Sequence, residues 1–464
     1  MQSIHRHGNL TMLTFGGRRC GYLELVISLL ALLLIIYTNI LGCGGGGGGS
    51  NNTGSQSRNV VASRWENVPL ARIEAGGMLS PRVKAARDAQ GTVHLAYFQD
   101  DDNTAAAYQI QYLVLDNPTG TLRTLSSSPE PEPVTSIDNC AALSLALGQD
   151  NLPVISYRGG TVRECGREQQ SDAMLSLKAA GGWGEYTGAV GIVERNPVFQ
   201  DGLAGTEVSV AVDSEGAIHL AYQFFYEGCD AMNYRYPDLC YVKKDRSALS
   251  AAALEETVEG NHYDDGSNVQ NSVGYHCVIT LDSGDNPVIF YYAELPGNTR
   301  GLRVARRQQG IWEKEWIEEG CVVGSISGAR CDAGGFLGVA YYVEEYGDGR
   351  ADHHCLRYAE EEASSWRIQM VDDTSWCGDY CSLAYDAAGS AAIAYYELKS
   401  HSGYAANNLR FAQLQEGAWK RETVASSGDI GLYNSLWFDG RNRPVICSYS
   451  GTERTIYLFH PAQV

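Results

Sequence analysis

The sequence predicts an all-β fold, a seven-bladed β-propeller built from four-stranded antiparallel blades. Three observations lead to this prediction: a strand–turn–strand phrase recurs seven times, Tyr and Gly are abundant, and one fourth strand is found at the opposite end of the chain. The 464 residues include 28 Tyr and 52 Gly, which favour strands and tight turns respectively. A length that suggests about three domains is therefore compatible with one repeat domain.

The recurring phrase is an apolar strand, a D-x-x-G turn and a second strand that ends in Tyr. The turn-opening residues are Asp88, Gly148, Asp213, Asp282, Asp332, Asp386 and Asp439. The closing residues are Tyr97, Tyr157, Tyr222, Tyr291, Tyr341, Tyr395 and Tyr449. A Gly, Asn or Asp that tolerates positive φ stands three residues after each opener. Asp at the start of a type I turn followed by such a residue predicts a hairpin with a bulge.

Two further strands follow each hairpin, and the fourth opens with Trp in several copies, as at Trp183, Trp312, Trp366 and Trp419. The first strand alternates large and small residues, which lets blades pack face to face near the axis. The last copy stops after its third strand, whereas residues 63–73 carry the Trp-led pattern. We therefore expect the N-terminal segment to complete blade seven and to remove the open edges of the array.

These repeats resemble the sialidase-like and BNR-repeat propellers of bacteria, and the resemblance covers residues 63–460. It implies the propeller fold and little more, because the sequence lacks the Asp-box S-x-D-x-G-x-T-W and a D-x-D-G-D-G calcium loop. Asp213-Ser-Glu-Gly216 comes closest to the Asp-box, but no T-W follows. Neither a sialidase arginine triad nor integrin-type calcium sites can be carried over, so we expect no cofactor and no metal.

The N-terminal residues predict a secretory signal peptide followed by a lipid anchor. Residues 1–42 have the order of a secretory signal peptide, with Arg18 and Arg19 before an apolar run and Gly42 at its end. The stretch Ile40-Leu41-Gly42-Cys43 resembles the lipobox of bacterial lipoproteins, which implies acylation at Cys43. Gly at position 44, where Asp would retain the protein, then implies sorting to the outer membrane. The alternative is an uncleaved membrane helix, because the apolar run is at the short end for spanning.

Residues 43–62 are predicted to be a tether, and residues 63–464 the propeller. The tether begins with Cys43 and six glycines and continues with polar residues, a composition typical of flexible linkers. The formal net charge of the whole chain is −20. A surface this acidic repels phosphate backbones, so nucleic acid is not an expected partner. We expect a monomer that contacts the membrane through its lipid.

Eleven cysteines follow Cys43, in a compartment that permits disulfides. Nine of them map to the ends of strands on one face, here called the top face, where the first strand of each blade begins. The predicted disulfides are Cys140–Cys165 and Cys229–Cys240. They would either hold long loops in place or make the top face rigid enough to carry a binding site. Cys331 and Cys447 lie within strands and are predicted to be buried thiols. No C-x-x-C pair supports a metal site.

The candidate ligand site is the mouth of the central channel on the top face. Its predicted residues precede the first strands of their blades: Asp138, Asn139, Tyr275, His276, Asp379, Tyr380, Tyr433 and Asn434. Aromatic faces together with hydrogen-bonding groups suit sugars or peptides, although ordinary loop polarity would give the same residue types. Arg330 is added because a cation on an innermost strand would need a carboxylate partner or an anionic ligand.

Other polar groups are given structural interpretations. His94 and His219 share one repeat position with Val in other blades and are interpreted as packing residues. Asp352-His353-His354 and Asp100-Asp101-Asp102 are weak metal candidates, since adjacent strand residues point apart and an acidic loop is usually solvated.

No catalytic residue can be assigned, because no G-x-S-x-G, H-E-x-x-H or Walker motif is present. The leading prediction is a binding propeller for a glycan or a protein. The alternative is an extracellular carbohydrate-active enzyme, a glycosidase or lyase, that uses carboxylates at the mouth such as Asp379, Glu207 or Glu344. A third possibility, a purely structural role, predicts no concave site.

Overall fold

The structure is a computed structural model. It divides into two compact units, Met1–Val61 and Ala62–Val464, and all of the described residues belong to the second. The structure describes residues 65–73, 82–100, 108–115, 130–137, 142–159, 164–165, 168–169, 172–179, 181–189, 202–226, 237–250, 255–260, 272–345, 353–363, 365–374, 376–398 and 407–462. Cys43, the signal segment and the tether lie outside these ranges. Within them, no helix has the length and apolar character needed to cross a bilayer.

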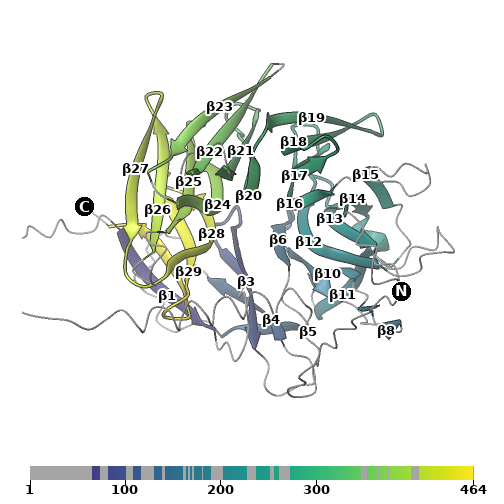
Figure 1. The fold of residues 1–464 in the computed structure, drawn as a ribbon. Helices are drawn as coiled ribbons and strands as arrows, with labels where there is room; N and C mark the ends of the chain where they lie inside the picture. Colours follow the sequence, from purple (N-terminus) through teal and green to yellow (C-terminus); the bar gives the residue numbers. More distant parts are fainter. Residues whose placement is uncertain are drawn as a thin grey trace, which may run out of the picture. The chain divides into compact units, whose positions relative to one another are not determined.

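Seven four-stranded antiparallel sheets form the blades, as the repeats predicted (Figure 1). Blade 1 consists of β2 (Val83–Arg87), β3 (Val93–Asp100), β4 (Tyr108–Leu115) and β5 (Glu132–Ile137). Blade 2 consists of β6 (Leu143–Leu147), β7 (Pro153–Gly159), β10 (Asp172–Ala179) and β11 (Gly182–Ala189), with the small hairpin β8 (Glu164–Cys165) and β9 (Glu168–Gln169) inserted. Blade 3 consists of β12 (Gly202–Val212), β13 (Ile218–Tyr226), β14 (Asp238–Lys244) and β15 (Glu255–Glu259), with a 3₁₀ turn at Arg246–Ala248.

The remaining blades follow the same order. Blade 4 consists of β16 (Ser272–Leu281), β17 (Pro287–Leu295), β18 (Thr299–Gln308) and β19 (Ile311–Glu319). Blade 5 consists of β20 (Val322–Arg330), β21 (Leu337–Glu345), β22 (His353–Glu362) and β23 (Ser365–Asp372). Blade 6 consists of β24 (Trp376–Tyr385), β25 (Ala391–Leu398), β26 (Asn408–Gln415) and β27 (Ala418–Ala425). Blade 7 consists of β28 (Ile430–Phe438), β29 (Pro444–Ser450), β30 (Thr455–Pro461) and β1 (Trp65–Arg72).

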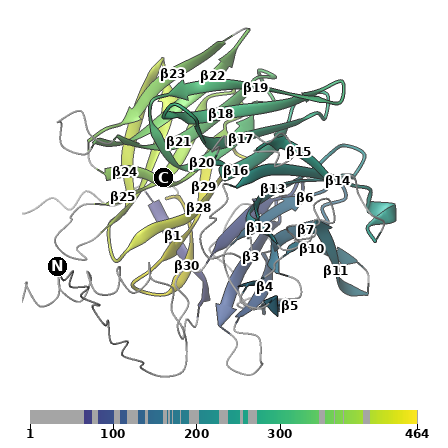
Figure 2. The ribbon, with the colours of Figure 1, turned by 45° about the vertical axis from the view of Figure 1, so that its right-hand side comes forward.

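The ring is closed by the N-terminal strand, and this prediction is confirmed. β1 pairs antiparallel with β30 from Trp65 opposite Pro461 to Arg72 opposite Thr455, so the two ends of the propeller lie side by side (Figure 2). Trp65 is buried and packs edge-on against Phe411 of blade 6, with ring centroids 5.4 Å apart. The N-terminal strand β1 therefore completes the sheet of blade 7 and packs that blade against blade 6.

The turn between the first two strands explains why Asp recurs there. In blade 6 the Asp386 carboxylate accepts the backbone N–H groups of Ala388 and Ser390 at 2.9 and 2.8 Å, and the same pattern holds at Asp282 and Asp439. These bonds satisfy donors that the tight turn leaves unpaired.

Blade 5 departs from the predicted register. Cys331, not Asp332, occupies the opener position, because its N–H bonds to Phe336 and its carbonyl accepts the N–H of Gly335. This turn is one residue longer than in blade 6, where Gly389 bonds back to Asp386. The longer turn explains the register error, since Asp332 follows the true opener directly in sequence.

A ring of serines joins the innermost strands. The serine four residues before the opener accepts a backbone N–H from the first strand of the next blade, as in the bond from Leu436 N to Ser382 Oγ at 2.9 Å. The serines that do this are Ser144, Ser209, Ser327, Ser382 and Ser435. Blade 1 has Lys84 at this position and blade 4 has Val278. The small residues that the alternation predicted therefore let neighbouring blades approach closely, and the serines among them also accept hydrogen bonds from the next blade.

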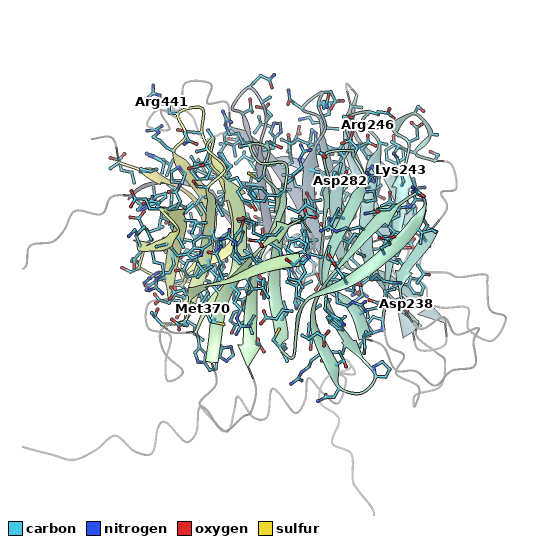
Figure 3. The ribbon with its side chains drawn as sticks, turned by 90° about the horizontal axis from the view of Figure 1, so that it is seen from above. Asp238, Lys243, Arg246, Asp282, Met370 and Arg441 are labelled. Atoms are coloured by element: carbon cyan, nitrogen blue, oxygen red, sulfur yellow. The ribbon has the colours of Figure 1, made fainter. Side chains whose placement is uncertain are left out.

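The propeller has two distinct loop faces. Figure 3 shows Asp282 and Arg441 of first-to-second-strand turns, with Arg246 after a third strand, near one end of the sheets. Asp238 and Met370 lie toward the other end, where third strands start and fourth strands finish. This second end is the top face, at which every first strand enters.

Candidate functional site

One residue from each blade stands six positions before the turn opener, at the top of the innermost strand. We call this set the mouth ring. Its members, in blade order, are Arg82, Ala142, Glu207, His276, Ser325, Tyr380 and Tyr433. They follow the same course around the axis as their blades, so they meet at the entrance of the central channel. A set with two tyrosines, an arginine, a glutamate and a histidine is unusually rich in ligand-binding side chains for one structural position.

Three members of the mouth ring have a left-handed backbone. His276, Tyr380 and Tyr433 have φ values of 54°, 51° and 53°, a conformation that costs non-glycine residues of order 1–3 kcal/mol each. Each follows a glycine of positive φ two residues earlier; a Cβ on one of these, Gly378, would lie 3.0 Å from Leu356 Cβ. Such strain concentrates at binding and catalytic sites, and here it turns three side chains at equivalent positions of blades 4, 6 and 7.

Aromatic rings line one side of the mouth. Tyr380 and Tyr433 contact each other edge to face with centroids 4.8 Å apart, and the guanidinium of Arg82 lies 6.0 Å from the Tyr433 ring centroid. Burial, with Tyr433 and Asp379 beside it, raises the pKa of the Tyr380 hydroxyl well above its usual range. At neutral pH Tyr380 is therefore a hydrogen-bond donor and not a base.

Acidic and neutral groups line the other side. Nδ1 of His276 lies 3.9 Å from Oε1 of Glu207, and both side chains remain partly accessible to water. Ser325 donates its hydroxyl to Asp379 and accepts the backbone N–H of Tyr380 at 2.9 Å. The Glu207–His276 pair places a carboxylate beside an imidazole, while Asp379 is held by its neighbours in blades 5 and 6.

Lys84 lies just below the mouth ring, within the channel. Its ammonium interacts electrostatically with Glu207 of blade 3 and Cys381 of blade 6, on opposite sides of blade 1, and with Arg82. Lys84 is exposed to water, but the surrounding channel walls desolvate its ammonium. Desolvation by these walls, and then repulsion from Arg82, lower the pKa of Lys84, against the opposing effects of Cys381 and Glu207.

The predicted site residues divide into three groups. His276, Asp379, Tyr380 and Tyr433 are brought to the channel mouth. Tyr275 stands one residue before the mouth ring, and its ring packs against Tyr292 and the core between blades 4 and 5. Asp138 and Asn139 lie outside the described residues.

Asn434 is buried and bonds the backbone oxygens of Tyr380 and Gly431 at 3.0 and 2.7 Å. Its amide nitrogen therefore joins the backbones of β24 and β28 below the mouth ring.

Arg330 is not at the mouth. It occupies the position directly before the opener, as Arg87 and Tyr385 do in their blades, and so lies at the opposite end of the innermost strand. Its guanidinium bonds the Asp332 carboxylate at 2.9 Å and the carbonyl of Asp282 at 3.3 Å. The cation therefore has its carboxylate partner at the turn, as the sequence analysis required of it, and it needs no anionic ligand.

The cysteines within the described ranges are buried thiols: Cys240, Cys277, Cys321, Cys331, Cys355, Cys377, Cys381 and Cys447. The expectation of buried thiols at Cys331 and Cys447 is confirmed, and burial raises the pKa of Cys447 to about 12. Cys140, Cys229 and the side chain of Cys165 lie outside the described part of the chain, so the pair Cys140–Cys165 stays a prediction. Cys240 is a free thiol, so the predicted pair Cys229–Cys240 is not formed in the structure.

His94 and His219 are buried, as their packing interpretation requires, but each also completes a hydrogen-bonded triad. His219 bonds Tyr241 Oη at 2.8 Å and Asp213 Oδ2 at 3.1 Å, and His94 has the equivalent partners Tyr112 and Asp88. Although burial opposes it, hydrogen bonds from Lys243 and His219 lower the pKa of Asp213 to about 2.

The two weak metal candidates gain no support. His354 packs between Tyr342 and Trp376, while Asp101, Asp102, Asp352 and the side chain of His353 are not described. Across the ranges that the structure covers, no cluster of three or more His, Cys, Asp or Glu side chains is arranged to hold a metal ion.

Sequence reasoning missed a repeated inter-blade clamp. In it, an acid ending the fourth strand of one blade receives the closing Tyr and a third-strand Arg of the next. The three clamps are Glu259 with Tyr291 and Arg303, Glu318 with Tyr341 and Arg357, and Asp372 with Tyr395 and Arg410. The signal was present as Leu-Arg at the start of the third strand in blades 4, 5 and 6.

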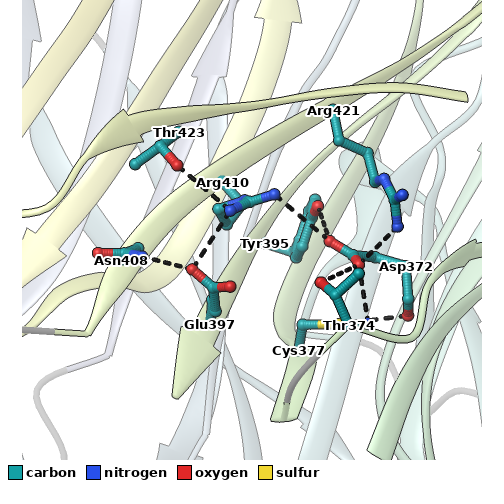
Figure 4. A network of polar contacts seen from close by, with 9 residues as sticks. All are labelled: Asp372, Thr374, Cys377, Tyr395, Glu397, Asn408, Arg410, Arg421 and Thr423. Atoms are coloured by element: carbon teal, nitrogen blue, oxygen red, sulfur yellow. Dashed lines mark hydrogen bonds and ion pairs between the residues drawn. The ribbon is translucent and has the colours of Figure 1, made fainter. Parts of the chain in front are cut away.

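The clamp of blades 5 and 6 is the most extensive (Figure 4). The fully buried Asp372 carboxylate accepts the hydroxyl of Tyr395 at 2.6 Å, that of Thr374 at 2.7 Å and Nη1 of Arg421 at 2.8 Å. Arg410 approaches it at 3.7 Å and links it to Glu397 at 3.4 Å. The Asp372 carboxylate is thus held by three donors, and the clamp joins blades 5 and 6 as a structural element.

A groove of about 550 Å³ lies between blades 4 and 5 on the face opposite the mouth. Its charged groups are largely paired with one another, as Arg306 is with Glu361 at 3.0 Å, and Arg306 also lies over the Trp366 ring. Such internal pairing leaves little for a ligand to satisfy, and the mouth remains the stronger candidate.

No protein-family model and no curated protein matches the chain. Similar solved structures include a polysaccharide lyase of family PL25, an ulvan lyase, with a TM-score of 0.53 and 11% identity over 85% of this chain and 95% of that chain. A Penicillium chrysogenum α-L-arabinanase gives 0.46 and 9% over 86% and 97%. A Trypanosoma rangeli sialidase gives 0.43 and 9% over 81% of this chain and 60% of that one. At such identities the likeness concerns the fold alone.

Proposed function

We propose that the protein is a glycan-binding propeller whose ligand lies across the mouth ring. One observation carries the proposal: seven equivalent positions, one per blade, bring two tyrosines, an arginine and a Glu–His pair to one entrance. Flat aromatic faces bind the apolar faces of sugar rings, and the surrounding polar groups bind hydroxyls. The ulvan lyase, which shares the fold, acts on a polysaccharide, and this supports a saccharide over a protein ligand.

The proposal predicts distinct effects for two substitutions of Tyr433. Tyr433→Ala removes the aromatic face and is expected to weaken binding of the glycan selected on an array about tenfold, the equivalent of about 1.4 kcal/mol. Tyr433→Phe keeps the face and should stay within about twofold of the original. Calorimetric titration measures both, with thermal unfolding as the check on folding. Equal affinity for all three proteins would contradict the proposal.

A second candidate function is a carbohydrate-active enzyme, favoured by the Glu207–His276 pair at the mouth. A carboxylate beside an imidazole provides the groups that general acid–base catalysis needs. Turnover of the bound polysaccharide, followed by reducing-end release, tests this function. Glu207→Gln should then abolish turnover and preserve binding, whereas absence of product from the original protein leaves the binding function alone.

The N-terminal anchor belongs to the same proposal. Acylation of Cys43 and the glycine-rich tether would hold the propeller at the envelope, in the outer membrane of a Gram-negative cell, with its ligand site free to face extracytoplasmic glycans. Incorporation of a labelled fatty acid, lost in Cys43→Ser, tests the lipid. Incorporation that persists in Cys43→Ser would contradict the assignment.

A further inference from the structure

Two cations near the mouth lack a protein anion. Among the residues that the structure describes, no carboxylate lies within ion-pair distance of Arg82 or Lys84. Nε of Arg82 is buried without a hydrogen-bond partner. Nε of Arg303 and of Arg410 is also without a partner, but the terminal nitrogens of both arginines pair with carboxylates, which those of Arg82 do not do among the described residues. A buried guanidinium donor without an acceptor is costly, so its retention requires an explanation.

Lys84 adds a second departure at the same place. It replaces the serine that five other blades use to join the innermost strands, so blade 1 gives up that inter-blade bond for a positive charge in the channel. Two acids of the mouth already have other partners, since Glu207 faces His276 and Asp379 accepts from Ser325. Both unpaired cations come from one strand, β2, and its entry residue.

We infer that Arg82 and Lys84 form an oxyanion subsite, and that the glycan carries a carboxylate or a sulfate ester. This inference deepens the proposed function and rests on it. A guanidinium presents parallel N–H donors to two oxygens of such a group, and the ammonium two residues further along the strand provides a point charge from below. The neighbouring Tyr433 ring would then receive the sugar face beside the anion. A protein with a net charge of −20 thus selects an acidic ligand through two local cations.

Matched probes separate charge from sugar recognition. The full-length protein is titrated with oligogalacturonate and its methyl ester, and with dextran sulfate and dextran, so that each pair differs only in its oxyanions. We expect at least about tenfold tighter binding of one charged member, weakened by added salt. The pair that shows the preference identifies the oxyanion as carboxylate or sulfate.

The decisive variant is Lys84→Ser, which restores the serine found in five other blades and so should fold. It should lose about tenfold affinity for the charged probe and change affinity for neutral glycans less than about twofold. Lys84→Met, which keeps the aliphatic stem, should give the same loss. Val278→Ser, the matched change in blade 4, should leave both affinities unaltered.

The outcomes separate the two levels of the proposal. Binding of neutral and charged members with equal affinity, or an unchanged ratio in Lys84→Ser and Lys84→Met, overturns the oxyanion subsite and leaves the glycan site standing. Failure of the original protein to bind any glycan on the array or any of the four probes overturns both.

Discussion

Removal of β1 is expected to abolish the folded propeller. The strand buries Trp65 and Leu70, and Ile73 just after it is fully buried. Truncating a buried side chain of this size costs roughly 2–5 kcal/mol, so losing all three approaches the whole stability of a typical domain, about 5–15 kcal/mol. A chain that starts at residue 74 should therefore be insoluble or lack a cooperative melting transition, whereas a chain that starts at residue 62 should melt as the full-length protein does.

A circular permutant provides the matched control. Trp65 lies opposite Pro461 in the pairing of β1 with β30, so residues 62–73 placed after Val464 through a short linker can form the same strand pair as a hairpin. This permutant should recover the melting transition that the deletion loses. A deletion variant that remains folded with an unchanged melting temperature would show that closure by β1 is dispensable.

Much of this fold could be predicted from the sequence because each blade repeats its turn chemistry. The spacing from Asp386 to Tyr395 recurs with little variation, and both ends of it have physical causes: the aspartate caps the turn, and the tyrosine is buried at the blade interface. Closure was predictable for a similar reason, since a Trp-led strand was missing at one end of the chain and present at the other.

The register of blade 5 was not predictable by the same reasoning. A cysteine opens its turn and an aspartate follows directly, so the sequence pattern selects the wrong residue. Because of that one-residue error, the sequence pattern did not place Arg330 directly before the turn opener, where the structure has it. Pattern matching fails where the chain inserts a residue in a turn, because a turn can absorb the insertion without changing the strands on either side.

The mouth was predicted in part. Tyr380, Tyr433 and His276 were recognised because aromatic and imidazole groups are conspicuous before a strand. Arg82 and Lys84 were missed, since a cation at the start of a strand is unremarkable until the seven blades are placed in one register. Counting six residues back from each opener would have found Arg82 from Asp88, and with Cys331 as the opener of blade 5 it also finds Ser325.

The inter-blade clamps were missed for a different reason. Their partners lie on adjacent blades, such as Asp372 on β23 and Tyr395 on β25, and no local pattern reports a contact between them. Only the Leu-Arg step of the third strand was visible in sequence, and a surface arginine explains it equally well. Long-range polar contacts therefore need the structure, whereas turns and alternation do not.

Asp372→Ala is expected to be the most destabilising single substitution of a polar residue in the clamps. It leaves the Tyr395 hydroxyl without its acceptor at 2.6 Å and takes a carboxylate away from both Arg410 and Arg421. Breaking a buried pair by removing one partner costs about 3–5 kcal/mol. The neighbouring Asp373 is exposed, so Asp373→Ala should change stability by no more than about 0.5 kcal/mol. Urea unfolding midpoints measure both.

The same carboxylate should make stability depend on pH in a defined direction. Burial by itself raises the pKa of Asp372, but hydrogen bonds from Tyr395 and Thr374, with the charge of Arg421, lower it overall. Because the folded pKa lies below the ordinary value of about 3.9, the ionised group stabilises the fold above that pH, and this contribution is lost as pH falls through the folded pKa. Asp372→Asn cannot ionise, so its loss of stability relative to the original protein should be largest near neutral pH and shrink in acid. A difference that stays constant from pH 7 down to the acid limit of folding would mean that hydrogen bonding alone, and not the charge of Asp372, holds blades 5 and 6 together.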